Sequence, residues 1–327
     1  MEILTTNTGS YPRVGDKPGQ QKLREKYNEW ETNEITDEEL EEVYKETTEN
    51  VIKEQVESGL DIVTDGQLRW YDPLSHFARK ISGCKVNGLL RFFDTNFYFR
   101  QPVIESEISW SEPMIKKEYL SARESSSVPV KPVLTGPYTM AKNSINKNYS
   151  DFNNLVMDFA EIISKEVKEL SESGAEIIQI DEPTILKNPE DTQILHDAVS
   201  ELSQEKREFE LALYVYFGNS TPLYEELTRL PIDTLGLDFT YSPDLPEKIG
   251  EIGCEKNLGL GLIDGRNTKR EKNREVLEKL REIIPNIESE RVYLNPSCGL
   301  DFLPREKAVE KLEHMVEIAN EAREEFE

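Results

Sequence analysis

The residues best suited to chemistry lie near the end of the chain, around a single cysteine. Residues 292–294 predict a short buried strand, which breaks at Asn295-Pro296 and leads Cys298 into the following turn. A thiol held in a turn at the exit of a buried strand is a common place for reactive groups in α/β enzymes. The alternative is a small buried cysteine that only packs against its neighbours.

A second candidate is the pair of adjacent carboxylates, Asp181 and Glu182, at the end of the apolar stretch 176–180. Two carboxylates at a buried strand exit cost desolvation energy unless a ligand or a hydrogen-bonding partner compensates for it. A ligand-binding role and a structural role, such as capping a helix, are both open at this point. The same alternatives apply to Asp65 and Thr135.

The elements that must position these groups repeat one unit: a short apolar strand, a polar loop and an amphipathic helix. The predicted strands are 4–10, 61–67, 130–137, 176–183, 209–217, 234–239, 257–263 and 292–295. The clearest helices are 37–58, 151–173 and 304–325. Residues 88–110 interrupt the pattern and predict a β-hairpin around Asp94–Asn96. Its aromatic side chains (residues 92, 93 and 97–99) are expected to form either a flap over the site or an exposed contact surface.

Eight such units in 327 residues predict an α/β fold, a (β/α)8 TIM barrel with a hairpin insertion after the second strand. Residues 1–327 are expected to form one domain. Thr8-Gly9-Ser10-Tyr11 is not the glycine-rich turn of a doubly wound nucleotide-binding sheet. In a barrel, the side chains at the C-terminal ends of the strands line one pocket. Here they are Ser10, Asp65, Gln67, Thr135, Asp181, Glu182, Tyr214, Tyr216, Asp238, Asp264 and Cys298.

Composition excludes several functional classes. Acidic residues outnumber basic ones by 64 to 39, and the resulting net charge of −25 repels nucleic acid and anionic membranes. The sequence contains no run of about 18 apolar residues and no basic-then-apolar leader at its N-terminus. Three widely spaced cysteines form no disulfide framework, so we expect a reducing, cytoplasmic location.

Four stretches resemble the catalytic half of the cobalamin-independent methionine synthase family. They are Thr5–Pro12 (TTNTGSYP), Gly59–Gln67 (GLDIVTDGQ), Gln179–Pro183 (QIDEP) and Leu294–Leu300 (LNPSCGL). They occur in order across nearly the whole chain, and its length is similar to that of the short, single-barrel members. The resemblance implies transfer of a methyl group to the sulfur of homocysteine, from a methylated folate or a methyl-corrinoid protein. It also implies a zinc ion that binds the substrate thiol and favours its thiolate form.

The resemblance also implies roles for individual residues. Asp181 would bind the amino group of the substrate with help from Gln67, Ser10 would hold its carboxylate, and Cys298 would be a zinc ligand. Cys298 and Asp181 are therefore the catalytic candidates. The substrate-binding candidates are Ser10, Gln67, Asp181, Glu182 and Tyr214.

The other zinc ligands of the family are replaced in this sequence. Tyr214 and Tyr216 stand where the family has a His-x-Cys pair after the fifth strand, and Asp238 stands where it has a glutamate. Tyrosine is a rare zinc ligand. His76, in the loop after the second strand, is the available replacement, so the predicted metal set is Cys298, Asp238 and His76.

Two functional hypotheses follow. The first is a methyltransferase that acts on homocysteine or a related thiol with an altered metal site. The second is a zinc-less paralogue that binds the amino acid and acts beside a second, zinc-bearing barrel subunit. A third reading uses Cys298 itself as a nucleophile, although no histidine lies at a neighbouring strand end to serve as its base.

Overall fold

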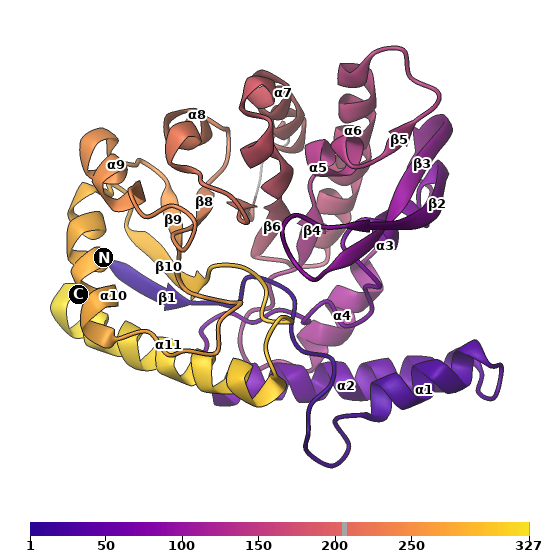
Figure 1. Ribbon diagram of the computed structural model, residues 1–327, viewed down its shortest axis with the longest axis horizontal. Coiled ribbons are helices and arrows are strands. Elements are labelled where there is room, and N and C mark those ends of the chain that lie inside the picture. The colour runs from indigo at the N-terminus through magenta and orange to yellow at the C-terminus, as the bar shows by residue number, and fades with distance from the viewer. Residues whose placement is uncertain (205–207, 327) are drawn as a thin grey trace.

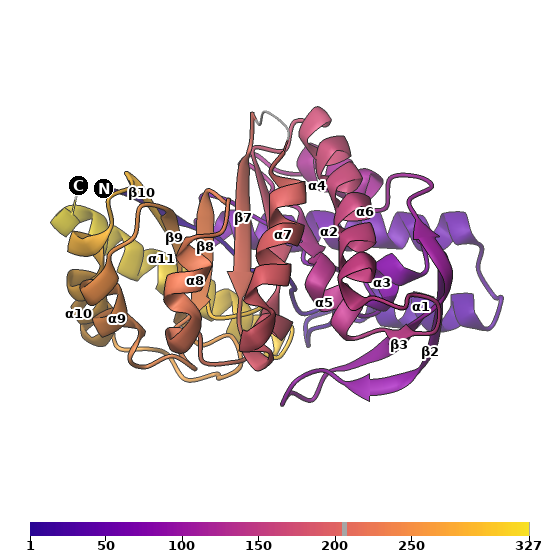
Figure 2. The same cartoon turned by 90° about the horizontal axis from the view of Figure 1, so that it is seen from above.

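A parallel sheet at the centre of the molecule positions every candidate site residue. The structure, a computed structural model, describes residues 1–204 and 208–326. Within them, a seven-stranded parallel sheet has the order β1-β10-β9-β8-β7-β6-β4 (Figures 1 and 2). The strands are β1 (Glu2–Thr5), β4 (Val133–Thr135), β6 (Ile177–Asp181), β7 (Glu210–Val215), β8 (Thr234–Asp238), β9 (Asn257–Ile263) and β10 (Arg291–Pro296).

The two edges of this sheet meet through the segment 61–64. Thr6 forms a parallel bridge with Ile62, and Val63 forms one with Val130, just before β4. The backbone N–H of Lys131 donates to the carbonyl of Val63 at 2.8 Å, which continues the ring. The predicted barrel is therefore confirmed. The second predicted strand, 61–67, pairs only at these bridges, because the chain turns at Gly66 and Gln67, which both have positive φ angles.

Apolar packing on both sides of the strands holds the barrel. Strands β6 and β8 are buried along their whole length, as expected for strands covered on both faces. Side chains that point into the barrel form a small cluster of their own, made of Ile62, Ile177, Ala212, Tyr214 and Tyr293. The residues that point outward join the large core beneath the helices.

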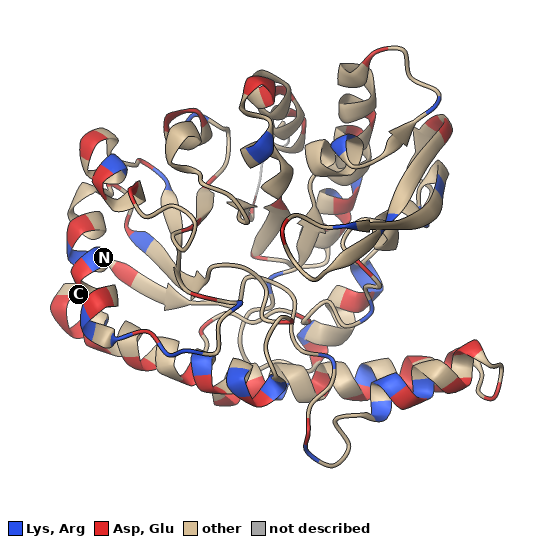
Figure 3. Ribbon diagram, in the orientation of Figure 1, with Lys and Arg blue, Asp and Glu red and all other residues tan. Residues whose placement is uncertain are grey.

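The helices surround this ring. They include α1 (Lys22–Glu31), α2 (Asp37–Glu57), α3 (Ser75–Ala78), α4 (Lys116–Glu124), α5 (Pro137–Lys142), α6 (Phe152–Glu172), α7 (Thr192–Leu202), α8 (Tyr224–Thr228), α9 (Leu245–Ile252), α10 (Asn273–Ile283) and α11 (Arg305–Phe326). A capping box between Thr36 and Glu39 begins α2 at Asp37, where the sequence predicted the helix to start. Acidic residues are spread along the outer helices, α1, α2 and α11 among them (Figure 3). None of the described helices is long and apolar enough to span a membrane.

The predicted hairpin is present and begins earlier than expected, with β2 at Ser82–Arg91 and β3 at Tyr98–Ser109. β3 also pairs with the short strand β5 (Ile145–Asn146). The hairpin turn does not form the exposed aromatic surface that the sequence suggested, because Phe92 and Phe99 are buried. Its rings pack on residues that follow β7 and β10, with centroid distances of 5.5 Å for Phe93–Phe217 and 5.9 Å for Phe97–Phe302. The turn therefore covers part of the C-terminal end of the barrel.

Candidate functional site

Cys298 lies in the turn after β10 and is fully buried. Its Sγ is 3.4 Å from the carbonyl oxygen of Gly299. Burial raises the pKa of this thiol well above its usual range, and the carboxylates of Asp238 and Asp301 raise it further. Cys298 is therefore held as a protonated thiol, which is a poor nucleophile.

Ser10 and Asp301 form a second part of the site beside this turn. The Ser10 hydroxyl donates to Asp301 Oδ1 at 2.7 Å, and the N–H of Leu300 donates to the Ser10 carbonyl at 2.8 Å. A Cβ on Gly299 would lie 1.8 Å from Ser10 Oγ, so only glycine allows this approach. Sequence reasoning did not assign Asp301 a role, although it lies three residues after Cys298 in the same turn.

Asp181 ends β6 and is buried at the same end of the barrel. Gln179 donates to its Oδ1 at 2.7 Å, and the hydroxyl of Tyr216 donates to its Oδ2 at 2.9 Å. Burial raises the pKa of Asp181 to about 7, against the opposing effects of these hydrogen bonds and of Lys131. A buried carboxylate of this kind can bind one cationic group.

Glu182, the neighbouring candidate, has a structural partner. Its two carboxylate oxygens accept from the N–H groups of Tyr138 (2.9 Å) and Thr139 (2.8 Å), at the start of α5. Gly136 lies so close that a Cβ there would be 2.2 Å from Glu182 Cδ. Glu182 therefore caps a helix end, one of the alternatives the sequence left open.

The two tyrosines of β7 occupy different levels of the barrel. The ring of Tyr214 fills the interior between Gly236 and Gly259, where a Cβ would come within 2.2 Å of Cδ1 and within 2.6 Å of the hydroxyl, respectively. Tyr216, two residues later, reaches Asp181. The structure therefore places the hydroxyl of Tyr216 against Asp181, and the substrate-binding role predicted for Tyr214 stays a prediction.

Gln67, which was expected to help Asp181, lies near Ser10. Its side chain packs on Gly9, and its backbone N–H donates to Asp65 Oδ1 at 2.9 Å. A narrow cavity brings Gln67 together with Ser10 and Asp301, and Arg13 and Phe97 also line it. Residues from the first two strand exits, the turn after β10 and the hairpin thus meet at one place.

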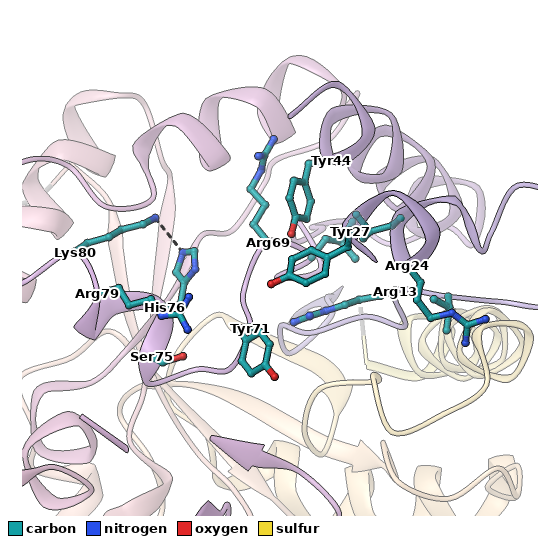
Figure 4. Close-up of a pocket in the computed structure, with 13 residues that line it drawn as sticks. Arg13, Arg24, Tyr27, Tyr44, Arg69, Tyr71, Ser75, His76, Arg79 and Lys80 are labelled. Atoms are coloured by element: carbon teal, nitrogen blue, oxygen red, sulfur yellow. Dashed lines mark hydrogen bonds between the residues drawn. The ribbon is translucent and has the colours of Figure 1, made fainter. Parts of the chain in front are cut away.

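Arg13 also lines a larger cavity of about 550 Å³, which we call the cationic cavity (Figure 4). Six of its lining side chains are basic, namely Arg13, Arg24, Arg69, His76, Arg79 and Lys80, and three are tyrosines, Tyr27, Tyr44 and Tyr71. No acidic residue lines it. Glu41 pairs with Arg69, and Glu118 pairs with His76 and Lys80. Within residues 1–204 and 208–326, the structure shows no ion pair for the other three, Arg13, Arg24 and Arg79. This concentration of positive charge, on a chain of net charge −25, favours an anionic ligand.

Comparisons with known proteins identify the family of this chain. The sequence model described as "Cobalamin-independent synthase, Catalytic domain" matches residues 3–321. The chain belongs to the cobalamin-independent methionine synthase family. A methionine synthase from Saccharolobus solfataricus is 33% identical over 99% of this chain and 96% of its own length. One from Saccharolobus islandicus is 35% identical over 99% and 96%, respectively.

Solved structures of family members share the fold. A B12-independent methionine synthase from Shewanella, in complex with selenomethionine, has a TM-score of 0.80 at 22% identity and covers 99% of both chains. A putative vitamin-B12-independent methionine synthase from Listeria monocytogenes has a TM-score of 0.74 at 18% identity, with 98% of this chain and 99% of that chain covered. At these identities the likeness concerns the fold alone.

The residues of this chain do not fit the zinc site that the family resemblance implies. Asp238 already accepts hydrogen bonds from the backbone and side chain of Thr240, at 2.9 and 2.6 Å. His76 lies 3.1 Å from Glu118 and stacks on Trp70, among the residues that line the cationic cavity. In the described part of the chain, no group of three or more His, Cys, Asp or Glu side chains could hold a metal ion. The structure therefore does not bring Cys298, Asp238 and His76 together as ligands.

The state of the thiols gives a first testable prediction. Burial raises the pKa of Cys84 to about 11 and also raises that of Cys254, as it does for Cys298. At pH 8, about one thousandth of a thiol with a pKa near 11 is ionised. We expect the native protein to resist a thiol-alkylating reagent at pH 8, and all three cysteines to react after denaturation, as measured by mass spectrometry. Rapid labelling of Cys298 alone would instead favour a nucleophilic role for it.

Proposed function

We propose that this protein transfers a methyl group from a methylated folate to the thiol of homocysteine or of a closely related amino acid. The observation that carries the proposal is Asp181, a buried carboxylate with two hydrogen-bond donors at the C-terminal end of a barrel of this family. Such a carboxylate can bind an ammonium group. In this proposal Ser10, at the same end of the barrel, would hold the substrate carboxylate once its hydroxyl turns away from Asp301.

The reaction balances without a further reactant. The bond between the methyl group and the folate nitrogen breaks, a bond from the methyl group to sulfur forms, and the proton of the thiol passes to that nitrogen. In this proposal the protein binds and orients the substrate thiol. No step uses Cys298 as a nucleophile. The covering turn of the hairpin excludes water, which strengthens the electrostatic interactions inside.

The cationic cavity supports a folate rather than a protein-bound methyl donor. A folate carries a flat heteroaromatic ring and a glutamate tail with carboxylates. Arginine forks bind carboxylates well, and tyrosine rings provide apolar faces for the rest of the molecule. Since Arg13 lines both this cavity and the narrow one beside Ser10, a ligand in the first lies next to the proposed thiol site.

A transfer assay with exchanged arginines tests this proposal. We expect the wild-type protein to convert homocysteine to methionine with 5-methyltetrahydrofolate as donor, with and without added zinc. Arg24→Gln and Arg79→Gln should each raise the KM for the donor about tenfold, the effect of losing one charge-assisted hydrogen bond. Both side chains are exposed, so the fold should not change.

Arg274→Gln is the matched control, because Arg274 is an exposed arginine on α10 and does not line the cavity. Its KM for the donor should equal that of the wild type. Absence of transfer, in a protein that still binds methionine, would contradict the methyltransferase proposal and favour the zinc-less binding subunit. Equal KM values for all variants would contradict the placement of the donor.

A further inference from the structure

Lys131 is a charged side chain inside the barrel with no obvious structural purpose. It lies just before β4, on the inner side of the ring, and is only 2% exposed. Among the described residues its Nζ has no hydrogen-bond partner. The amine instead lies over the ring of Tyr214, 4.7 Å from its centroid. Burying an ammonium group without a partner is costly, so its charge needs compensation from nearby groups.

Two carboxylates inside the barrel could provide this compensation. Burial lowers the pKa of Lys131 to about 7, while Asp181 and, to a smaller extent, Glu210 at the start of β7 act to raise it. Glu210 already has its own partners, however. It accepts from the hydroxyl of Tyr293 at 2.8 Å and lies 3.5 Å from the guanidinium of Arg291.

Among the described residues, Lys131 is the cation that acts on Asp181. The two described donors to Asp181, Gln179 and Tyr216, are neutral. Glu182 and Tyr214 also interact electrostatically with Asp181, and neither can carry a positive charge. β4 lies directly beside β6, with Thr135 opposite Asp181 in the register, and Tyr214 is opposite Asp181 on the other side. The ring beneath Lys131 Nζ therefore belongs to the immediate neighbour of Asp181.

We infer that Lys131 is a positioning residue of the amino-acid site: its ammonium form, inside the barrel, favours the ionised form of Asp181, which binds a substrate ammonium group. The binding of a substrate ammonium group rests on the proposed function. Without Lys131, burial would favour the neutral carboxylic acid, which binds an ammonium group weakly. Lys131 does not touch the substrate and acts through Asp181.

The electrostatic link can be measured without any substrate. In protein labelled with 13C-aspartate, the carboxyl resonance of Asp181 is assigned with an Asp181→Asn variant and followed against pH. In Lys131→Met and Lys131→Gln, we expect the midpoint of this titration to rise by at least about one pH unit, as for a buried acid that loses a nearby cation. Lys311→Met is the matched control, because Lys311 is an equally buried lysine that binds Glu271. An unchanged midpoint in both Lys131 variants would overturn the inference.

Binding of two related ligands tests the role in recognition. L-methionine and 4-(methylthio)butanoate differ only in the amino group. At pH 7, calorimetry should show that the Lys131 variants bind L-methionine at least about fivefold more weakly, because a rise of one unit lowers the ionised fraction of Asp181 about fivefold, and that they bind the des-amino compound as the wild type does. Affinity for L-methionine should return as the pH rises above the shifted midpoint of Asp181.

The possible failures are distinguishable. Equal losses for both ligands would mean that Lys131 only supports the fold, and would overturn the positioning role. A shifted Asp181 midpoint in a protein whose wild type binds neither ligand would contradict the proposed function, while the link between Lys131 and Asp181 would stand.

Discussion

Replacing Asp181 by asparagine should weaken binding of L-methionine and homocysteine by a factor between about 100 and a few thousand. Removing one partner of a buried charge pair costs about 3–5 kcal/mol, and each 1.4 kcal/mol corresponds to a factor of ten in affinity. Asparagine has nearly the shape of aspartate, so it can keep one of the hydrogen bonds from Gln179 and Tyr216. The fold should therefore persist. Calorimetric titration with L-methionine measures the loss directly.

Glu182→Gln is the control for this experiment, since it makes the same chemical change at the next residue. Glu182 accepts from two backbone N–H groups at the start of α5. Its replacement should reduce the free energy of unfolding by about 1–3 kcal/mol and leave the affinity for L-methionine unchanged. If Glu182→Gln weakens binding as strongly as Asp181→Asn, the amino group is not bound by Asp181 alone and the site assignment fails.

Gly299→Ala should have the second largest effect, on both stability and binding. The new Cβ would lie 1.8 Å from Ser10 Oγ, which is far inside van der Waals contact. The serine must then rotate away, and the buried Asp301 loses the hydroxyl that donates to it at 2.7 Å. An unsatisfied buried carboxylate costs about 1–3 kcal/mol. Urea denaturation should show this destabilisation, and methionine binding should fall in parallel.

Gly88→Ala provides the matched control, because Gly88 lies in the hairpin and a Cβ there meets no atom within 4 Å. It should change neither stability nor binding. Introducing Gly299→Ala into a Ser10→Ala background should cost less than in the wild type, because the clashing oxygen is already absent. A full additive cost in the double variant would show that Ser10 is not the residue displaced.

Much of the fold could be predicted because buried parallel strands leave a clear pattern. Stretches such as 257–263 and 234–239 are almost wholly apolar, and the structure places β9 and β8 there. The segment 61–67 was harder to interpret. Its apolar first half pairs with both neighbours, but its polar second half turns away with Gln67 at a φ of 54°.

The site was less predictable, for reasons of three-dimensional placement. Strand alternation shows that Tyr214 and Tyr216 point to the same side, but not which of the two lies at the level of Asp181. Lys131 drew no attention, because a lysine in a sequence is normally exposed. The cationic cavity combines side chains from residues 13–80, and it depends on how α1 packs on α2 and on the loop before α3, which no local pattern reveals.

The hairpin has a consequence for how such a protein can diversify. In the described residues its strands pair only with each other and with β5, and none of them joins the barrel sheet. The hairpin that covers this end of the barrel is thus hydrogen-bonded separately from the barrel sheet. Its turn can change in length or in aromatic content without altering any strand register beneath it. If the protein acts on thiols as proposed, its selectivity among them can therefore evolve in the hairpin turn alone, while the barrel stays unchanged.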